Sequence, residues 1–412
     1  MARERRVGVW LHGRPVGQIT SRKRTEVRFR YDDEAREHGL NVPVLSCSLP
    51  TSTRTVPARP FFAGLLPEGD ARRKLAADAG LVVDDVLGLL LRYGQDVAGA
   101  VVVGDEVSSR PRARADLYTD ADLFSDVVAL SDRSAPLALH DDSELSIAGL
   151  QDKMLLVRTA GGWARPVNGF PSTHILKIDD RAHHGLVIAE HVCLAVARAA
   201  GLPASGTQLE RIGDLDILIV ERFDRAPGVD GVPERIHQED ACQALGVDLE
   251  ANPRAKYEQH GGPRLRQVAT VLRSWGTDED LYRLLDQVVF TVAIGNADAH
   301  GKNISVLHRT LGTVQLAPLY DTTPTLLWPT LRARAAMSVG GVVDLTHTGA
   351  EDIVREAQSW HLPVPIVRER VLRTLNRVRV AVDELDVPDH EMAARTVHLI
   401  RTRTDALLTG AA

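Results

Sequence analysis

The 412-residue sequence has no long apolar run, few cysteines and few lysines. Because no stretch of 18 apolar residues occurs, a membrane-spanning helix is not expected. Residues 1–6 are basic with no apolar segment behind them, unlike a secretory signal. The three cysteines are far apart and odd in number. None forms a spaced ligand pair with a histidine, which argues against a disulfide framework or a zinc site and indicates a reducing cytoplasm.

Neither basic nor acidic residues are in large excess, with 49 Lys and Arg against 55 Asp and Glu. The net charge is −6, with 44% hydrophobic and 25% charged residues, which indicates a globular protein not devoted to nucleic acid. The first 30 residues are locally basic, through Arg3, Arg5, Arg6, Arg14, Arg22, Lys23, Arg24, Arg28 and Arg30. These could contact a phosphate backbone, but a solvated strand face is the favoured interpretation.

The order of predicted elements indicates the fold class. We expect strands or hairpins at 7–20, 27–31, 97–103, 154–158, 173–178, 215–220 and 304–316, and helices at 70–79, 84–92 and 186–200. The hairpin at 7–20 should turn at Gly13 and Pro15. Beyond residue 225 the pattern is helical apart from 304–316. This predicts an α+β, two-lobed kinase-like fold. Its expected parts are an extra β-rich subdomain (1–105), the rest of a nucleotide-binding small lobe (106–225) and a helical large lobe (226–412).

The segment N-A-D-A-H-G-K-N (296–303) suggests phosphoryl transfer. Asp298 and Asn303 have the D-x-x-x-x-N interval of a kinase catalytic loop. A carboxylate can accept the proton of the attacking hydroxyl, and the amide oxygen can bind magnesium. Lys302 could neutralise the transferred phosphate, and His300 could pack the loop. The pair alone occurs by chance in chains of this length, so its context matters.

Two further segments supply that context. A hairpin after Asn303 returns the chain to A-P-L-Y-D, so Asp321 should come back beside Asn303 as a second magnesium ligand. Lys177 ends the strand T-H-I-L-K-I, where it could bind phosphates if Glu190 of the next helix pairs with it. A lone strand lysine is more often a surface residue, and only the order of these residues favours the functional interpretation.

The segment S-I-A-G-L-Q-D-K (146–153) has one glycine and matches a phosphate-binding loop poorly. Its backbone amides could still cover phosphates, with Lys153 helping. Together with T-H-I-L-K-I, V-E-R-F-D-R, Q-E-D-A-C-Q, H-G-G-P, D-A-H-G-K-N and P-L-Y-D, it resembles the HipA family of bacterial toxin kinases. F-F-A-G-L-L-P-E-G resembles that family's N-terminal subdomain.

This resemblance implies an ATP- and magnesium-dependent serine/threonine protein kinase that inhibits growth and is linked to persistence. It implies Asp298 as general base, and Asn303 with Asp321 as metal ligands. It also implies nucleotide contacts from Gly149, Gln151, Asp152, Lys153, Lys177 and a hinge at Glu221 to Phe223, autophosphorylation at Ser146, and supporting roles near the site for Gln238, Glu239 and Asp240. The family pattern differs at Leu150 and Asp152, which leaves the role of Asp152 open.

The implied partners are a helix-turn-helix antitoxin of HipB type, operator DNA mainly through that antitoxin, and a protein substrate such as an aminoacyl-tRNA synthetase. Two alternatives stay open. One is a small-molecule or lipid kinase, because similar loops occur there. The other is a non-catalytic corepressor that binds antitoxin and operator, against which the intact Asp298, Asn303, Asp321 and Lys177 argue.

Overall fold

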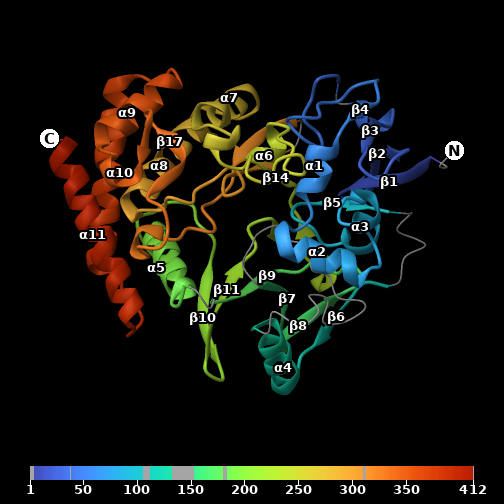
Figure 1. Ribbon diagram of the computed structural model, residues 1–412, viewed down its shortest axis with the longest axis horizontal. Helices are drawn as coiled ribbons and strands as arrows, with labels where there is room; N and C mark the ends of the chain where they lie inside the picture. The colour runs from blue at the N-terminus through green and yellow to red at the C-terminus, as the bar shows by residue number, and fades with distance from the viewer. Residues whose placement is uncertain are drawn as a thin grey trace.

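The computed structural model describes residues 4–37, 39–104, 112–131, 153–179, 183–309 and 312–411. In Figure 1 the N-terminal subdomain (blue) and the C-terminal helices (red) lie at opposite ends, with the strands of the small lobe between them. This is the two-lobed α+β arrangement that the sequence predicts.

The N-terminal subdomain is a five-stranded antiparallel sheet in the order β4-β3-β2-β1-β5 with three helices. The turn between the first two strands has positive φ at His12 (50°) and Gly13 (74°), the geometry that two-residue hairpins favour. Pro15 lies in a strand opposite Trp10, so the prediction that it belongs to the turn is wrong. The elements are β1 (Arg5–Leu11), β2 (Arg14–Ser21), β3 (Arg28–Tyr31), β4 (Val56–Pro57), α1 (Arg59–Gly64), α2 (Gly69–Asp78), α3 (Val86–Tyr93) and β5 (Val101–Val103).

The small lobe is a six-stranded sheet in the order β10-β11-β9-β7-β8-β6. Alternation along a strand sends neighbouring side chains to opposite faces. Leu176 and Ile178 join the core shared with the N-terminal subdomain, whereas Ile175 packs on the core around α5. Lys177 therefore faces α5. The elements are β6 (Arg114–Leu117), α4 (Asp120–Ser131), β7 (Lys153–Thr159), β8 (Gly162–Val167), β9 (His174–Ile178), α5 (Leu186–Ala199), β10 (Thr207–Ile212) and β11 (Leu215–Glu221).

The large lobe is helical but holds more strands than expected. Besides the predicted hairpin β15–β16 it contains β14, β12–β13 and β17–β18, whose short strands give little periodicity to detect. The elements are β12 (Arg225–Ala226), β13 (Glu234–Arg235), β14 (Gln238–Asp240), α6 (Ala241–Ala244), α7 (Leu265–Trp275), α8 (Asp278–Ile294), β15 (Ser305–His308), β16 (Val314–Leu316), β17 (Arg334–Val339), β18 (Val342–Asp344), α9 (Ala350–Ser359), α10 (Val364–Glu384) and α11 (Glu391–Ala411). Short 3-10 turns lie at Glu34–Arg36, Val229–Gly231, Glu258–His260, Thr325–Leu327 and Leu345–His347.

A buried ionic network joins the N-terminal subdomain to residues 222–225, which follow β11. Arg225 donates to Asp96 Oδ1 at 2.8 Å, and the guanidinium of Arg222 forms two hydrogen bonds with Asp224. Asp224 in turn accepts the Gly99 amide at 2.7 Å. The word E-R-F-D-R thus holds the subdomains together, a structural role that the sequence analysis missed.

We expect Asp96→Asn to lower the free energy of unfolding by about 3–5 kcal/mol, because removing one partner leaves buried charge uncompensated. Burial alone would raise the pKa of Asp96, but Arg225 and Arg222 outweigh it and lower that pKa. The stabilisation is therefore present above the ordinary carboxyl pKa of about 3.9 and is lost as the pH falls below it.

Denaturant unfolding at neutral and acidic pH measures this effect. The control is Asp116→Asn, since the Asp116–Arg114 pair is solvent-exposed and should contribute at most about 1 kcal/mol. Equal losses in the two variants would contradict the role given to Asp96.

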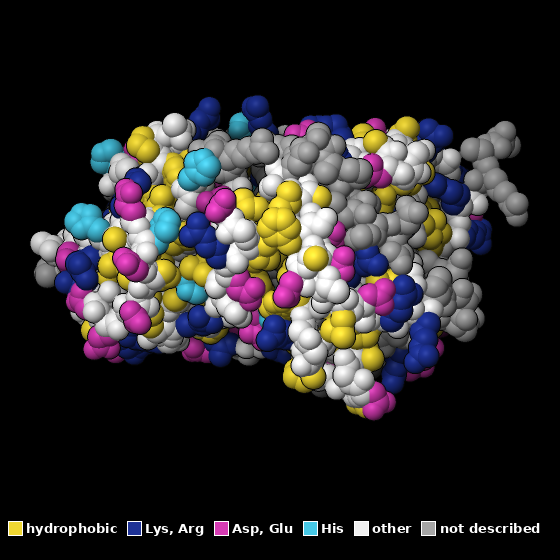
Figure 2. All heavy atoms as spheres, turned by 90° about the horizontal axis from the view of Figure 1, so that it is seen from below, with side chains coloured by type: hydrophobic (Ala, Val, Ile, Leu, Met, Phe, Trp, Pro, Cys, Tyr) yellow, Lys and Arg dark blue, Asp and Glu magenta, His cyan; other side chains and the backbone are white. Residues whose placement is uncertain are grey.

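The outer surface has mixed charge. In Figure 2 basic and acidic side chains are interspersed over the face shown. Among the described residues, no helix is long and apolar enough to cross a membrane.

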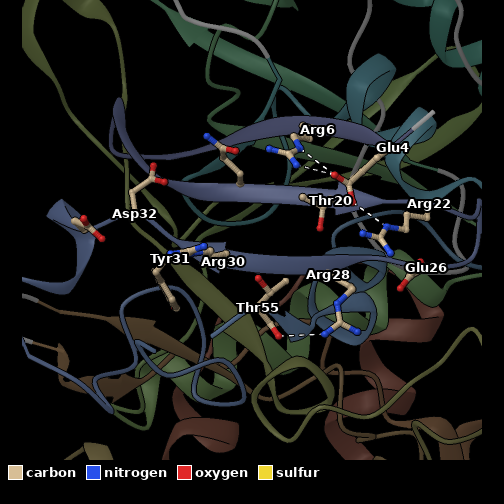
Figure 3. Close-up of a pocket in the computed structure, with 12 residues that line it drawn as sticks. Glu4, Arg6, Thr20, Arg22, Glu26, Arg28, Arg30, Tyr31, Asp32 and Thr55 are labelled. Atoms are coloured by element: carbon tan, nitrogen blue, oxygen red, sulfur yellow. Dashed lines mark hydrogen bonds and ion pairs between the residues drawn. The ribbon is translucent and has the colours of Figure 1, made fainter. Parts of the chain in front are cut away.

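The basic N-terminal stretch forms the wall of an open groove of about 760 Å³ on the first sheet. Figure 3 shows its arginines among acidic residues. Glu4 accepts hydrogen bonds from Arg6 and from Arg22, at 2.8 Å and 3.0 Å for the shortest of each. This is the mixed-charge, solvated strand face that the sequence favoured.

Candidate active site

A cavity of about 300 Å³ lies between the lobes and brings together most of the predicted site residues. Its walls come from all three parts of the chain. They include Glu68, Lys153, Lys177, Glu221, Phe223, Gln238, Asp240, Lys256, Asp298, His300, Lys302, Asn303 and Asp321.

Helix α8 presents the loop that carries Asp298. The helix begins with a capping box at Thr277 and ends at Gly295, whose φ is 73°, a conformation that glycine adopts without strain. In the loop that follows, the Asn296 side chain accepts the Asp298 amide at 3.0 Å. The Asp298 carboxylate is exposed to the cavity and accepts a hydrogen bond from the Tyr257 hydroxyl at 2.9 Å. A hydroxyl group therefore already bonds to this carboxylate.

The rest of the loop is fixed by close packing. A Cβ on Gly301 would lie 2.6 Å from Pro263 and 2.8 Å from Cys242 Sγ, so only glycine fits. The Tyr320 hydroxyl donates to the Lys302 carbonyl at 2.7 Å. His300 packs edge-on against Tyr257, with ring centroids 5.3 Å apart. The words H-G-G-P, D-A-H-G-K-N and P-L-Y-D are therefore one packed unit.

Lys177 lies between two carboxylates. Its ammonium is 2.7 Å from Glu190 Oε1 and 2.8 Å from Asp321 Oδ1. Burial opposes the charge of Lys177, but Asp321 and Glu190 outweigh it and raise the pKa of Lys177. For the same reason the Lys177 ammonium overcomes burial and holds the pKa of Asp321 well below its usual range. Both groups are ionised at neutral pH, as phosphate and cation binding require.

Asn303 and Asp321 meet as the returning hairpin predicts. Asn303 Nδ2 donates to Asp321 Oδ2 at 3.0 Å. The Asn303 Oδ1 atom is buried and has no hydrogen-bond partner among the described residues. A free amide oxygen beside an ionised carboxylate fits a hard cation such as Mg²⁺, which prefers oxygen ligands.

Lys153 lies directly across from Lys177 in the ladder between β7 and β9. Burial, assisted by the charge of Lys177, lowers the pKa of Lys153 to about 7. An anion in the cavity would favour the charged form, so this position is suited to a phosphate group.

Lys302 pairs with carboxylates of the protein itself, whereas the sequence suggested that it could neutralise the transferred phosphate. Its ammonium is buried, 2.8 Å from Asp240 Oδ2 and 3.5 Å from Glu68 Oε1. Asp240 also caps α6 by accepting the Gln243 amide. Lys302 is therefore already paired inside the protein, and its pair with Glu68 links the loop to the N-terminal subdomain.

Sequence reasoning missed two residues that line this cavity, Glu68 and Lys256, and their neighbour Tyr257. Glu68 belongs to the N-terminal word L-P-E-G and pairs with Lys256 at 3.1 Å. Tyr257 follows Lys256 and reaches Asp298. The scarcity of lysine was the available signal for Lys256, but the sequence alone could not supply its partner.

The segment after β11 lines the cavity with Glu221 and Phe223. On β14, Gln238 and Asp240 also line it, whereas the Glu239 carboxylate points to the opposite face and binds Ser46 and Cys47. Glu239 is near the site in the chain, but its side chain is not among those that line the cavity, because neighbouring residues on a strand face opposite sides. Ser146, Gly149, Gln151 and Asp152 lie outside the described residues.

Comparisons with known proteins find similar sequences over most of the chain. The family model of the HipA N-terminal domain matches residues 7–104, and that of the HipA-like C-terminal domain matches residues 145–384. Y4mE of Sinorhizobium fredii, whose name proposes a kinase, is 36% identical over 387 residues, which is 91% of this chain and 90% of Y4mE. The serine/threonine-protein kinase toxin HipA of Shewanella oneidensis is 26% identical over 79% of this chain and 76% of its own.

A solved structure is also similar. The complex of HipA, HipB and operator DNA from the Shewanella oneidensis toxin–antitoxin system matches at a TM-score of 0.83 and 22% identity, covering 98% of both chains. This likeness confirms the predicted fold.

Proposed function

The chain belongs to the HipA family of kinases, and from this premise we propose that it is a serine/threonine protein kinase acting as a growth-inhibiting toxin. The reaction is transfer of the γ-phosphate of ATP to a protein serine. One observation supports it above the others. Lys177, Asp298, Asn303 and Asp321 all line one cavity of about 300 Å³, and the buried Glu190 holds Lys177 from behind.

In this proposal Asp298 is the general base. Its carboxylate accepts the proton of the substrate hydroxyl, which takes the place of the Tyr257 hydroxyl now bonded to it. Asn303 Oδ1 and Asp321 hold Mg²⁺, which when bound neutralises charge on the ATP phosphates. His300 packs beneath Tyr257, and Lys302 keeps the loop in place through Asp240.

The nucleotide is held by the small lobe. Lys177 and Lys153 face the phosphates, and Gly149, Gln151 and Asp152 belong to the segment that covers them. The amides of Glu221 and Arg222 already donate to Gly206 and Thr173. Among the described residues this leaves the amide of Phe223 to bind the adenine base.

We also propose that the chain divides into residues 1–105, 106–225 and 226–412. The first and last of these parts meet at the cavity, through Glu68 and Asp298. We also propose a cytoplasmic setting, in which the three free cysteines remain reduced. The partner that restrains the toxin is a helix-turn-helix antitoxin of HipB type, which brings the complex to operator DNA. An aminoacyl-tRNA synthetase is the first protein target to examine.

Phosphorylation in a lysate of the source organism tests the proposal. The purified chain is incubated with that lysate, labelled ATP and Mg²⁺, and phosphopeptides are compared with those from the Asp298→Asn variant. New phosphoserine dependent on Asp298 is the expected result. Label only in small molecules or lipids would favour the alternative kinase, and no transfer at all would favour the corepressor.

Ser146 is expected to become phosphorylated when the chain is incubated with ATP and Mg²⁺, and the modified form should bind ATP more weakly. A phosphate adds roughly −1.5 to −2 charges beside Asp141, Asp142 and Glu144 and competes with ATP for Lys153. Mass spectrometry and nucleotide titration measure both effects.

The matched control is Ser146→Ala, which should remain active and keep full ATP affinity after the incubation. An unmodified Ser146 in active enzyme, or equal ATP affinity of the two forms, would rule out this self-inactivation.

A further inference from the structure

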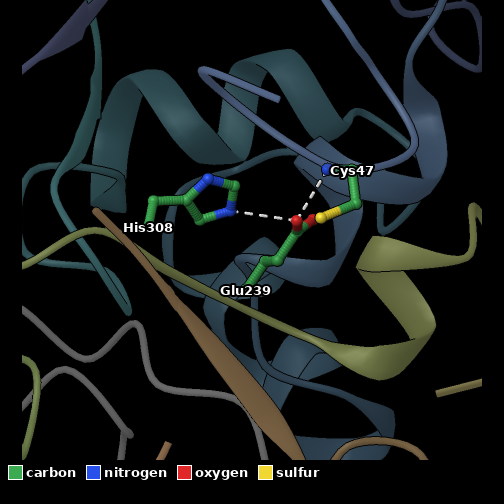
Figure 4. Close-up of side chains that lie close together, drawn as sticks. All are labelled: Cys47, Glu239 and His308. Atoms are coloured by element: carbon green, nitrogen blue, oxygen red, sulfur yellow. Dashed lines mark hydrogen bonds and ion pairs between the residues drawn. The ribbon is translucent and has the colours of Figure 1, made fainter. Parts of the chain in front are cut away.

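Three potential metal ligands converge on the face of β14 that is opposite the catalytic cavity. Cys47 comes from the loop before β4, Glu239 from β14 and His308 from the end of β15. Their sulfur, carboxylate and ring-nitrogen atoms all lie within 4.8 Å of one another, and Figure 4 shows them pointing to a common centre.

The orientation of His308 is set from outside the group. Its Nδ1 atom is 2.8 Å from the Pro43 carbonyl, so Nδ1 is the protonated nitrogen that donates. In the neutral ring Nε2 is then an acceptor, yet it lies 3.0 Å from Glu239 Oε1. Two acceptors this close need a proton or a cation between them. A backbone carbonyl that orients the ring of a histidine is the usual arrangement around a metal-binding histidine.

Glu239 is fixed as well. Its Oε2 atom accepts the Ser46 hydroxyl at 2.6 Å, and its Oε1 atom accepts the Cys47 amide at 2.7 Å. Glu239 and the His308 side chain are almost fully buried, whereas Cys47 is only half-buried. The group therefore has preset ligands, and Cys47 is the member that is partly accessible to solvent.

We propose that Cys47, Glu239 and His308 form a zinc-binding site, with the fourth position taken by water. Sulfur, nitrogen and oxygen donors together suit Zn²⁺. Bond lengths of about 2.0–2.3 Å keep tetrahedral ligands roughly 3.4–3.8 Å apart, so modest side-chain movements close the site. On binding, the thiol loses its proton to solvent and the sulfur becomes the ligand.

Zinc at this position would join the N-terminal subdomain to the strand that lines the catalytic cavity. Cys47 belongs to the former, and Glu239 lies between Gln238 and Asp240, which face the cavity. The sequence argued against zinc because the three cysteines are far apart and odd in number and none forms a spaced ligand pair with a histidine. The three ligands proposed here are more than sixty residues apart, so no motif spacing marks them. Because the Cys47 thiol must lose its proton to become a ligand, zinc affinity should increase with pH.

Metal titration of the full chain tests the site without any activity assay. Chelator-treated protein is titrated with Zn²⁺ against a chromophoric competitor, and separately with Co²⁺. We expect one equivalent bound with roughly micromolar affinity or tighter, and a thiolate-to-cobalt charge-transfer band. Cys47→Ser and His308→Gln should each weaken zinc binding at least about tenfold, the loss that even outer-shell changes produce.

Cys193→Ala and His398→Gln are matched controls that should keep full affinity, since neither residue belongs to the group. Thermal unfolding in chelator verifies that every variant is folded. Should a variant not fold, the cobalt spectrum of the parent still decides the question. No stoichiometric zinc, unchanged affinity in both site variants, or a cobalt spectrum without a thiolate band would each overturn the site.

Discussion

Asp298→Asn is expected to lower the rate of phosphoryl transfer by a factor of about 10²–10⁴, the usual effect of removing a general base. The amide keeps the size of the carboxylate but cannot take the proton of the attacking hydroxyl. It can still accept the Tyr257 hydrogen bond, which in the parent is 2.9 Å long. The local structure should therefore survive the substitution.

ATP affinity should stay near that of the parent in this variant. The groups proposed to bind the phosphates are Lys177 and Lys153, and the shortest ion pairs of Lys177 are with Glu190 and Asp321. Single-turnover kinetics and a separate ATP titration distinguish the two effects. Asp116→Asn, a change of the same kind on the exposed strand β6, is the control. Turnover close to the parent would remove Asp298 from the role of base.

The sequence predicted that the proposed site residues lie close together, because their spacing along the chain is short. Asp298 and Asn303 share one loop. The short hairpin that follows brings the chain back, so that Asp321 lies beside Asn303. Lys177 lies on a strand and Glu190 on the helix that follows it. The short connection between the two elements explains why the side chains pair at 2.7 Å. In each case a few residues of chain determine the distance.

The missed features depend on contacts between remote segments. Glu68 pairs with Lys256 across almost two hundred residues, and Asp96 meets Arg225 across more than a hundred. Nothing in the local pattern distinguishes these charges from solvated ones. The orientation of the Glu239 side chain could not be predicted for another reason. The segment Q-E-D lies beside the site, but strand alternation turns the Glu239 side chain to the opposite face, and the sequence did not reveal a strand there.

Asp321→Asn is the second substitution with a large expected effect, and it should act on both activity and the magnesium dependence of ATP binding. Partial burial opposes ionisation of Asp321, but Lys177 keeps its pKa well below the usual range. The parent thus presents a full negative charge at neutral pH, beside the free Oδ1 of Asn303. The amide removes that charge and leaves Lys177 with Glu190 as its remaining carboxylate partner. We expect phosphoryl transfer to fall by at least about 10², as when a preorganised electrostatic group is lost.

Nucleotide titrations with and without Mg²⁺ separate the two roles of Asp321. In the parent, Mg²⁺ should tighten ATP binding, whereas in Asp321→Asn the two affinities should be nearly equal. Lys177→Met is the comparison, because it should weaken ATP binding by a similar factor in both conditions while leaving Asn303 and Asp321 in place. Magnesium that still tightens ATP binding to Asp321→Asn as much as to the parent would show that the cation is held elsewhere. The Lys177–Asp321 pair would then only close the cavity, since its 2.8 Å contact joins the small lobe to the large lobe.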